Sequence, residues 1–142
     1  MLDMTKPFVL ALEHRKIHYS HKELKDGNDL IAVTFTGKEI PSVTLNYIFD
    51  EKQNNINVRV YDLIPVIKER YLDQVLEAAN ELNARYRFTK FVVDMDKRTI
   101  HLELDMFARA DFSAYVSFQA MSLIMRVCDA SYQTLMSAIG RR

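Results

Sequence analysis

Residues 90–106 read KFVVDMDKRTIHLELDM and contain the clearest strand pattern in the chain. Phe91 and Val93 alternate with outward-facing neighbours, and the same alternation returns over residues 100–106 after a short polar turn. A period of two places successive side chains on opposite faces of a strand. The stretch therefore predicts a β-hairpin whose return strand buries one face and exposes the other.

Three further strand patterns precede this hairpin. They occupy residues 30–36, 42–49 and 56–61, which are rich in β-branched and aromatic side chains and are joined by short polar loops. Short loops between alternating strands are typical of an antiparallel meander with one solvent-facing side. The return strand of the hairpin fits the same sheet.

Helical periodicity occurs before and between these strands. An apolar stripe over residues 8–12 predicts a short first helix, which fades by Arg15. A second helix is expected to begin at Asp62 as its cap, with Pro65 in its first turn. Its apolar residues recur at steps of three and four as far as Leu82.

The last helix is predicted from Asp111, its expected cap, to about Ile139. At 100° per residue its apolar residues cover about two thirds of the helix circumference. A helix lying on a single sheet needs an apolar arc less than half as wide as this one. We therefore predict that the surplus face contacts a second subunit or a partner protein. The candidate interface residues are Phe118, Met121, Met125, Tyr132 and Met136.

The fold class that follows is α+β, with the order α-β-β-β-α-β-β-α and an antiparallel sheet of about five strands. The chain of 142 residues is predicted to form a single domain over residues 1–142. Hydrophobic residues make up 49% and charged residues 27%, which excludes a disordered chain or a disulfide scaffold. Nineteen basic residues balance nineteen acidic ones, so a nucleic-acid partner is not expected.

Location is indicated by the N-terminal residues and by the cysteine usage. The apolar run over residues 8–12 is too short for a signal peptide, and no run approaches the roughly 20 residues that a membrane span needs. The lone cysteine, Cys128, lies in an apolar stretch and is interpreted as a buried structural thiol rather than a nucleophile. These features predict a cytoplasmic protein that does not bind membranes.

Three histidines form the most conspicuous candidate metal site. His14, His18 and His21 have the spacing that would bring three imidazoles to one helical face. A strand beginning near Ile17 would scatter the three rings instead. The simpler interpretation is a solvated, basic helix end. A metal-binding protein or small enzyme using this cluster is kept as the alternative function.

Paired carboxylates in the hairpin are the second candidate for chemistry. Asp94 and Asp96 share one strand face, as do Glu103 and Asp105. Such pairs serve acid/base chemistry or bind hard cations, but they also occur on any solvated hairpin face. No nucleophile elbow, zinc motif or phosphate-binding loop is present. We therefore predict no enzyme activity, no catalytic residue, no metal and no cofactor.

Two smaller features also carry aromatic or ionisable side chains. Residues 86–88 (Tyr-Arg-Phe) with Lys90 interleave aromatic and basic side chains, which suits stacking on single-stranded nucleic acid. Anchoring the corner between the second helix and the following strand is the favoured interpretation of the three residues. His101 lies on the polar face of its strand and is expected to be exposed.

The run Asn80-Glu81-Leu82-Asn83, followed by Lys90-Phe91 at the start of the next strand, resembles the YbjN-like family of bacterial proteins. The extended stretch over residues 43–58 is also similar. The family adopts a fold like that of type III secretion chaperones. The resemblance implies a sheet with helices on one face, a dimer built through the central elements, and a protein-binding or regulatory role without catalytic residues.

The leading hypothesis is thus a non-enzymatic, homodimeric protein-binding module in a bacterium. Its partner segment would add to a sheet edge or lie in a groove. A purely structural subunit of a larger complex is a third hypothesis.

Overall fold

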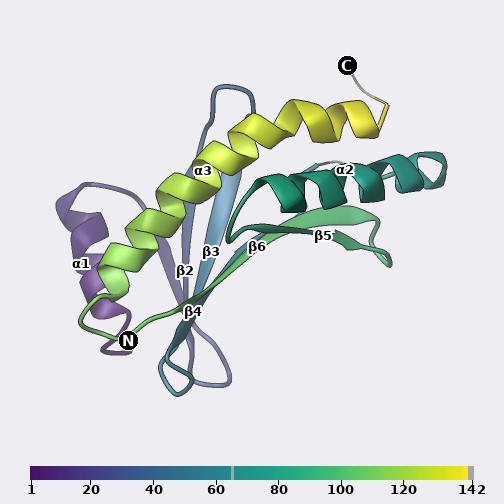
Figure 1. The fold of residues 1–142 in the computed structure, drawn as a ribbon. Coiled ribbons are helices and arrows are strands. Elements are labelled where there is room, and N and C mark those ends of the chain that lie inside the picture. The colour runs from purple at the N-terminus through teal and green to yellow at the C-terminus, as the bar shows by residue number, and fades with distance from the viewer. Residues whose placement is uncertain (65, 141–142) are drawn as a thin grey trace.

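A single antiparallel sheet of six strands organises the described part of the chain, residues 1–64 and 66–140 of a computed structural model. Its order is β1-β2-β3-β4-β6-β5 (Figure 1). The strands are β1 (Ser20–Glu23), β2 (Asp29–Phe35), β3 (Val43–Asp50), β4 (Asn55–Val60), β5 (Lys90–Asp94) and β6 (Thr99–Phe107). The α+β class and the antiparallel meander are confirmed. The sixth strand is β1, which has no apolar alternation because all four of its residues are exposed.

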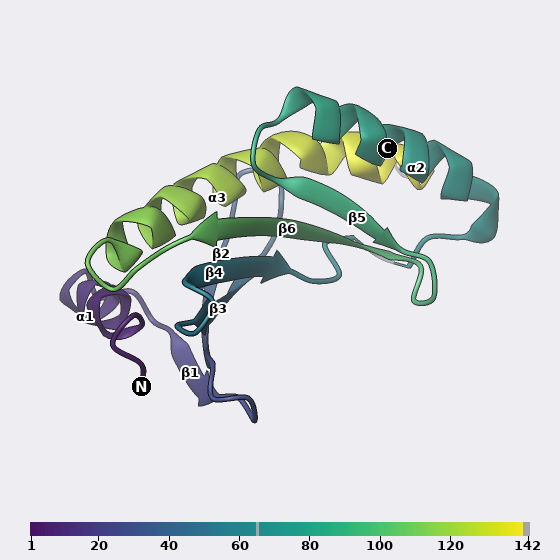
Figure 2. The ribbon, with the colours of Figure 1, turned by 60° about the horizontal axis from the view of Figure 1, so that its bottom comes forward.

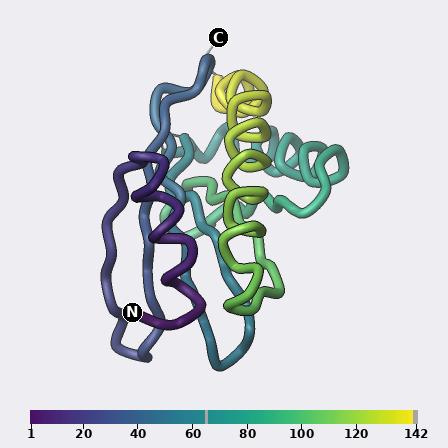
Figure 3. Tube along the Cα trace, turned by 90° about the vertical axis from the view of Figure 1, so that its left-hand side faces the viewer, coloured from purple at the N-terminus to yellow at the C-terminus, as the bar shows by residue number. Residues whose placement is uncertain are grey.

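The α-helices of the described residues are α1 (Lys6–His14), α2 (Leu72–Arg85) and α3 (Ser113–Ala138), and a short 3-10 turn η1 (Glu69–Tyr71) leads into α2. They lie on one face of the sheet (Figures 1 and 2), as the family resemblance implied. α3 contacts α1 near one end and α2 near the other, and Figure 3 shows it running along the molecule with α1 beside it. No helix in this part of the chain combines the length and hydrophobicity needed to cross a membrane.

The core lies between this layer of helices and the sheet. Ile31, Tyr47 and Val58 face it from three adjacent strands and are fully buried. Tyr47 pairs with both of the others across the ladders, so the strand register aligns them on one face. The Tyr47 hydroxyl donates a hydrogen bond to the Ser117 carbonyl oxygen at 3.0 Å, which ties the sheet to α3.

The predicted start of the second helix is wrong. Residues after Asp62 run alongside β6 instead, because the Leu63 N–H donates to a β6 carbonyl oxygen at 2.9 Å. The Ile67 N–H donates to the turn before β6 at 2.7 Å. α2 begins only at Leu72. The prediction was wrong because the buried residues of this irregular segment have a spacing that a helix also produces. Pro65 lies outside the described residues.

The predicted cap of the last helix is also wrong. α3 begins at Ser113, and Phe112 occupies the cap position without a side-chain hydrogen bond. The Phe112 N–H donates to the Arg109 carbonyl oxygen at 3.1 Å, so a backbone turn leads into the helix. Asp111 lies 3.9 Å from the Arg109 guanidinium instead.

Candidate functional site

The interface residues predicted on α3 pack largely within the chain. Met121 is buried, and the Phe118 ring meets the Phe8 ring edge-on with 5.2 Å between centroids. The Arg15 guanidinium lies 3.8 Å above the centre of the Phe118 ring. The other three residues are partly buried against the core: Met125, Tyr132 and Met136. Contacts with α1 and the core therefore cover much of this face. Its role as an interface between molecules stays a prediction.

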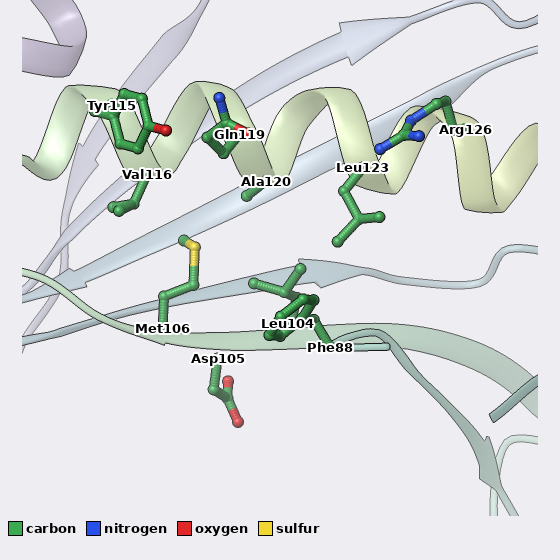
Figure 4. Close-up of a pocket in the computed structure, with 10 residues that line it drawn as sticks. All are labelled: Phe88, Leu104, Asp105, Met106, Tyr115, Val116, Gln119, Ala120, Leu123 and Arg126. Carbon is green, nitrogen blue, oxygen red and sulfur yellow. The ribbon is translucent and has the colours of Figure 1, made fainter. Parts of the chain in front are cut away.

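An apolar groove of about 420 Å³ lies on another side of α3, between this helix and β6. Leu104 and Met106 of β6 form its floor, and Val116, Ala120 and Leu123 of α3 form its wall. Figure 4 shows these side chains pointing toward one another across the gap. The groove is the candidate functional site because it is concave and lined mainly by apolar side chains, as ligand and peptide sites usually are.

The edge of β6 beside the groove is open. The Ala108 N–H donates a hydrogen bond to the Asn54 carbonyl oxygen, in the turn before β4, at 3.0 Å. The backbone N–H and C=O groups of every second residue of β6, counted back from Ala108, therefore point toward β4. In an antiparallel strand, the backbone groups of Asp105 and Phe107 must then point away from β4. β5 ends its pairing opposite Glu103. No strand in the described part of the chain pairs with this edge beyond Glu103.

Phe88 marks the point where the chain leaves this edge. Its φ is 72°, a left-handed conformation that bulky residues rarely adopt. The Thr89 N–H donates to the Arg87 carbonyl oxygen at 2.8 Å, which closes a tight turn toward α2. The side chain of Phe88 is 79% exposed and lines the groove. Corner anchoring is thus confirmed for Tyr86, which packs against the core, and is wrong for Phe88.

Of the two charged side chains that line the groove, Asp105 has an ion pair and Arg126 has none among the described residues. The Arg59 guanidinium lies 2.7 Å from the Asp105 carboxylate and 3.7 Å from the Glu103 carboxylate, on the open face of the sheet. Figure 4 shows Asp105 pointing away from the other lining residues. Arg126, at the far end of α3's side of the groove, has no ion pair with any residue the structure describes.

The three histidines do not assemble into a site. His14 ends α1, His21 lies in β1, and His18 lies between them. Within residues 1–64 and 66–140, no three His, Cys, Asp or Glu side chains are placed to hold a metal ion. His21 Nε2 lies 2.8 Å from the Asp29 carboxylate instead. The turn out of α1 scattered the rings.

Asp29 holds the N-terminal segment against the sheet. Its buried carboxylate accepts hydrogen bonds from the Leu2 N–H at 2.8 Å and from the Thr5 hydroxyl at 2.7 Å. Burial alone would raise the pKa of Asp29. The hydrogen bonds from His21, Leu2 and Thr5 outweigh burial and hold this pKa below its usual value. The arrangement is a structural anchor, because all of these contacts lie within the chain.

The hairpin carboxylate Asp94 also has structural partners. It accepts hydrogen bonds from the N–H groups of Asp96 and Lys97, both at 3.0 Å. His101 Nε2 lies 3.3 Å from its second oxygen. The Lys97 hydrogen bond is the largest cause of a lowered pKa for Asp94. The expected exposure of His101 is wrong: its side chain is only 12% exposed, because the Tyr61 ring packs edge-on against it.

Asn83 explains the motif that carried the family resemblance. Its side-chain oxygen accepts a hydrogen bond from the Phe91 N–H at 2.6 Å, and its amide donates to the Phe91 carbonyl oxygen at 3.0 Å. One side chain thus satisfies both backbone groups of a residue in β5. The motif fixes α2 against the edge strand and needs no chemistry of its own.

Cys128 is fully buried, which confirms the structural interpretation. Burial, together with the charge of Asp129, raises the pKa of its thiol to about 12. The thiolate that nucleophilic chemistry requires is therefore strongly disfavoured.

Sequence reasoning missed the residues around the groove. Val116 and Leu123 belong to the apolar arc of α3, yet its methionine-rich border drew the prediction. Phe88 and Tyr115 carried no pattern that marked them. Only the ends of β5 and the path of α3 place these four residues around one groove.

The fold and site define a small α+β domain with an apolar groove beside an open strand edge. A family model, YbjN, matches residues 10–135 and is described as "putative bacterial sensory transduction regulator". This match spans most of the chain, so the chain belongs to the YbjN family. The family is described as a regulator and not as an enzyme. No curated protein and no solved structure matches the chain.

Proposed function

We propose that this YbjN domain is a non-enzymatic regulatory module that acts by binding another protein in the groove between α3 and β6. One observation carries the proposal: aromatic side chains stand exposed around an apolar groove. Phe88 is 79% exposed and Tyr115 is 67% exposed, and both line this groove. Aromatic residues are enriched in protein interfaces, and an apolar surface of this kind on a soluble domain favours a binding role.

The non-enzymatic part of the proposal is supported by the ionisable side chains. Asp29 and Asp94 are each engaged by backbone and side-chain donors of the same chain. Cys128 is buried away from solvent. None of these three residues lines the groove between α3 and β6. These three groups, whose pKa values are shifted, thus serve the fold.

Site-specific photocrosslinking in the native bacterial host tests the binding role. A benzophenone amino acid replaces Tyr115 at the groove rim, or replaces Leu10 on α1, which is similarly exposed at 64%. We expect a discrete adduct from position 115 only. Phe88→Asn, which removes an exposed ring and suits a positive φ, should abolish that adduct without unfolding the domain.

The captured protein is then purified and rebound to the wild-type domain and to Phe88→Asn. Binding that depends on Phe88 supports the proposal. Equal adducts from positions 115 and 10, or an adduct insensitive to Phe88→Asn, would contradict it. A captured large assembly that binds at a constant stoichiometry and shows no regulatory response would favour a structural subunit instead.

We also propose that the domain is a homodimer. Its support is the width of the apolar arc on α3, whose partly buried members remain available to a second copy. Light scattering on a sizing column should give about twice the 16.6 kDa chain mass. Met125→Asp and Tyr132→Asp should then reduce this mass to that of one chain while circular dichroism stays native. If the wild-type protein is a monomer at all concentrations tested, the proposed homodimer is contradicted.

A further inference from the structure

We infer that the groove binds an extended segment of another protein, which adds to the open half of β6 as an antiparallel strand and places an acidic residue beside Arg126. This inference deepens the proposed function and rests on it. It concerns how the partner is recognised and which chemistry the partner must carry.

The backbone of β6 provides the first argument. Asp105 and Phe107 each carry one N–H donor and one C=O acceptor on the side away from β4. β5 covers this side only as far as Glu103. An incoming strand would continue the line of β5 and pair with both residues, as peptides do in β-augmentation.

The groove provides the second argument, because it suits alternate side chains of such a strand. Those that point toward the helices would meet Val116, Ala120 and Leu123. Tyr115 and Arg126 mark the ends of the helical wall and are about 16 Å apart along a helix axis. A strand of about five residues spans that length. The intervening side chains would face the helical wall about every second residue.

Charge complementarity identifies the end group. α3 runs opposite to β6, since Figure 4 places Tyr115 beside Met106 and Leu123 beside Leu104. A strand antiparallel to β6 therefore ends, at its C-terminal side, near Arg126. This guanidinium has no ion pair among the residues of the described chain, so a carboxylate at that end of the segment complements it.

The same charges favour another protein over a second copy. The open half of β6 offers one carboxylate, Asp105, and Arg59 already holds it at 2.7 Å. Two copies that paired through this edge would thus bring together two Arg126 guanidinium groups, and the open halves of β6 would supply no free carboxylate for either. A segment with alternating apolar residues and an acidic C-terminal end satisfies both the edge and the charge.

A short peptide tests this chemistry directly. The probe is a fluorescein-labelled, C-terminally amidated heptapeptide of sequence SVTVSLE, with the matched amidated peptide SVTVSLK and the reversed amidated peptide ELSVTVS as controls. Binding is measured by fluorescence anisotropy. We expect SVTVSLE to bind about fivefold more tightly than either control, which is the upper end of the effect of one solvent-accessible ion pair.

Variants of the protein and of the peptide test the ion pair with Arg126 and the backbone pairing with β6 separately. Arg126→Glu should reverse the preference, so that SVTVSLK binds more tightly than SVTVSLE. N-methylation of the backbone amides that face β6 should weaken SVTVSLE by about tenfold or more, because each lost hydrogen bond is worth about that factor. Leu10→Asn, on the exposed surface of α1, should change none of these affinities.

Amide hydrogen exchange locates the peptide. Bound SVTVSLE should protect the amides of Asp105 and Phe107, which are open in the free protein. Absent binding, equal binding of the N-methylated peptide, or no protection at these two amides would each overturn the inference. Protection that rises with protein concentration without peptide would assign the edge to a second copy and overturn it as well. The Tyr115 crosslink would survive in these cases if only strand addition is wrong.

Discussion

The two halves of β6 share one hydrophobic alternation but have different neighbours. Thr99–Glu103 pairs with β5, and its other side faces β4 at Leu102 and Glu103 and the Leu63 N–H at Ile100, whereas Leu104–Phe107 pairs with β4 alone (Figure 2). Leu102 and Leu104 are both buried toward the helices. The first half is part of a closed core, and the second half is the floor of a groove. The same pattern of residues therefore makes a core or a binding surface according to what covers its edge.

The cover over the first half has an identifiable cause. Asn83 holds α2 against Phe91, and β5 then pairs with β6. At Phe88 the backbone turns away with a positive φ, and this cover ends. Variants at matched positions in the two halves test this difference.

The largest difference is expected from side-chain truncation at matched floor positions. Leu102→Ala removes a fully buried side chain between two paired strands and should lower the free energy of unfolding by about 3 kcal/mol. Met106→Ala, in the partly open half, should cost about 1 kcal/mol or less, since its site already contacts solvent. Urea denaturation of both variants measures the difference. Equal losses would mean that the two halves are equally enclosed.

Removal of the clamp on β5 should have the next largest effect. Asn83→Ala leaves the backbone N–H and C=O of Phe91 without their partner and should cost about 2 kcal/mol. Asn80→Ala, on the exposed face of α2, is the matched control and should change stability by less than about 0.5 kcal/mol. Denaturation of the two variants side by side gives the result. A neutral Asn83→Ala would show that β5 is held by strand pairing alone.

Acid should weaken the closed half through Asp94. Hydrogen bonds from Lys97 and His101, among others, lower the pKa of Asp94, so its ionised form stabilises the folded state above the ordinary value of 3.8. This contribution is lost as the pH falls through the lowered folded-state pKa.

Asp94→Asn should therefore destabilise the protein near neutral pH and converge with wild type in acid. Urea midpoints from about pH 6 to about pH 3 test the expected direction. If the difference in urea midpoint between the two proteins stays constant across this range, ionisation of Asp94 is not its cause.

The smallest effect on stability is expected in the open half. Phe107→Ser replaces a side chain that is 89% exposed, so the free energy of unfolding should change by less than about 0.5 kcal/mol. Binding of the added strand should still weaken, because the Phe107 side chain would lie beside that strand on the outer face of the sheet. Thermal denaturation and the SVTVSLE anisotropy measurement check the two parts. A large loss of stability would place Phe107 in a folding contact instead.

The sequence predicted most of the sheet because β3, β4 and β6 alternate strictly and each buries one face. It missed β1, whose residues are polar and exposed and which forms only by pairing with β2. It also extended the second helix toward Asp62, because Ile64 and Ile67 are buried at a spacing that a helix also produces. Periodicity reports burial, and burial alone does not distinguish these conformations.

The candidate site was less predictable than the fold. The wide apolar arc of α3 is divided between contacts with α1 and α2 and the wall of the groove. The sequence favoured its methionine-rich border, which packs near Phe8 and the core. The groove lies at the other border, near Val116, and depends on the open edge of β6. An edge is defined by a missing neighbour, which no local pattern records.

The sequence by itself determined the α+β class, the antiparallel strands and the family, because local alternation and short motifs encode them. Tertiary structure alone decided where β5 stops, which side of α3 faces an open edge, and that Arg126 stands there without an ion pair. The physical reason is that backbone pairing and side-chain burial depend on neighbours distant in the chain. The binding surface arises where those neighbours end.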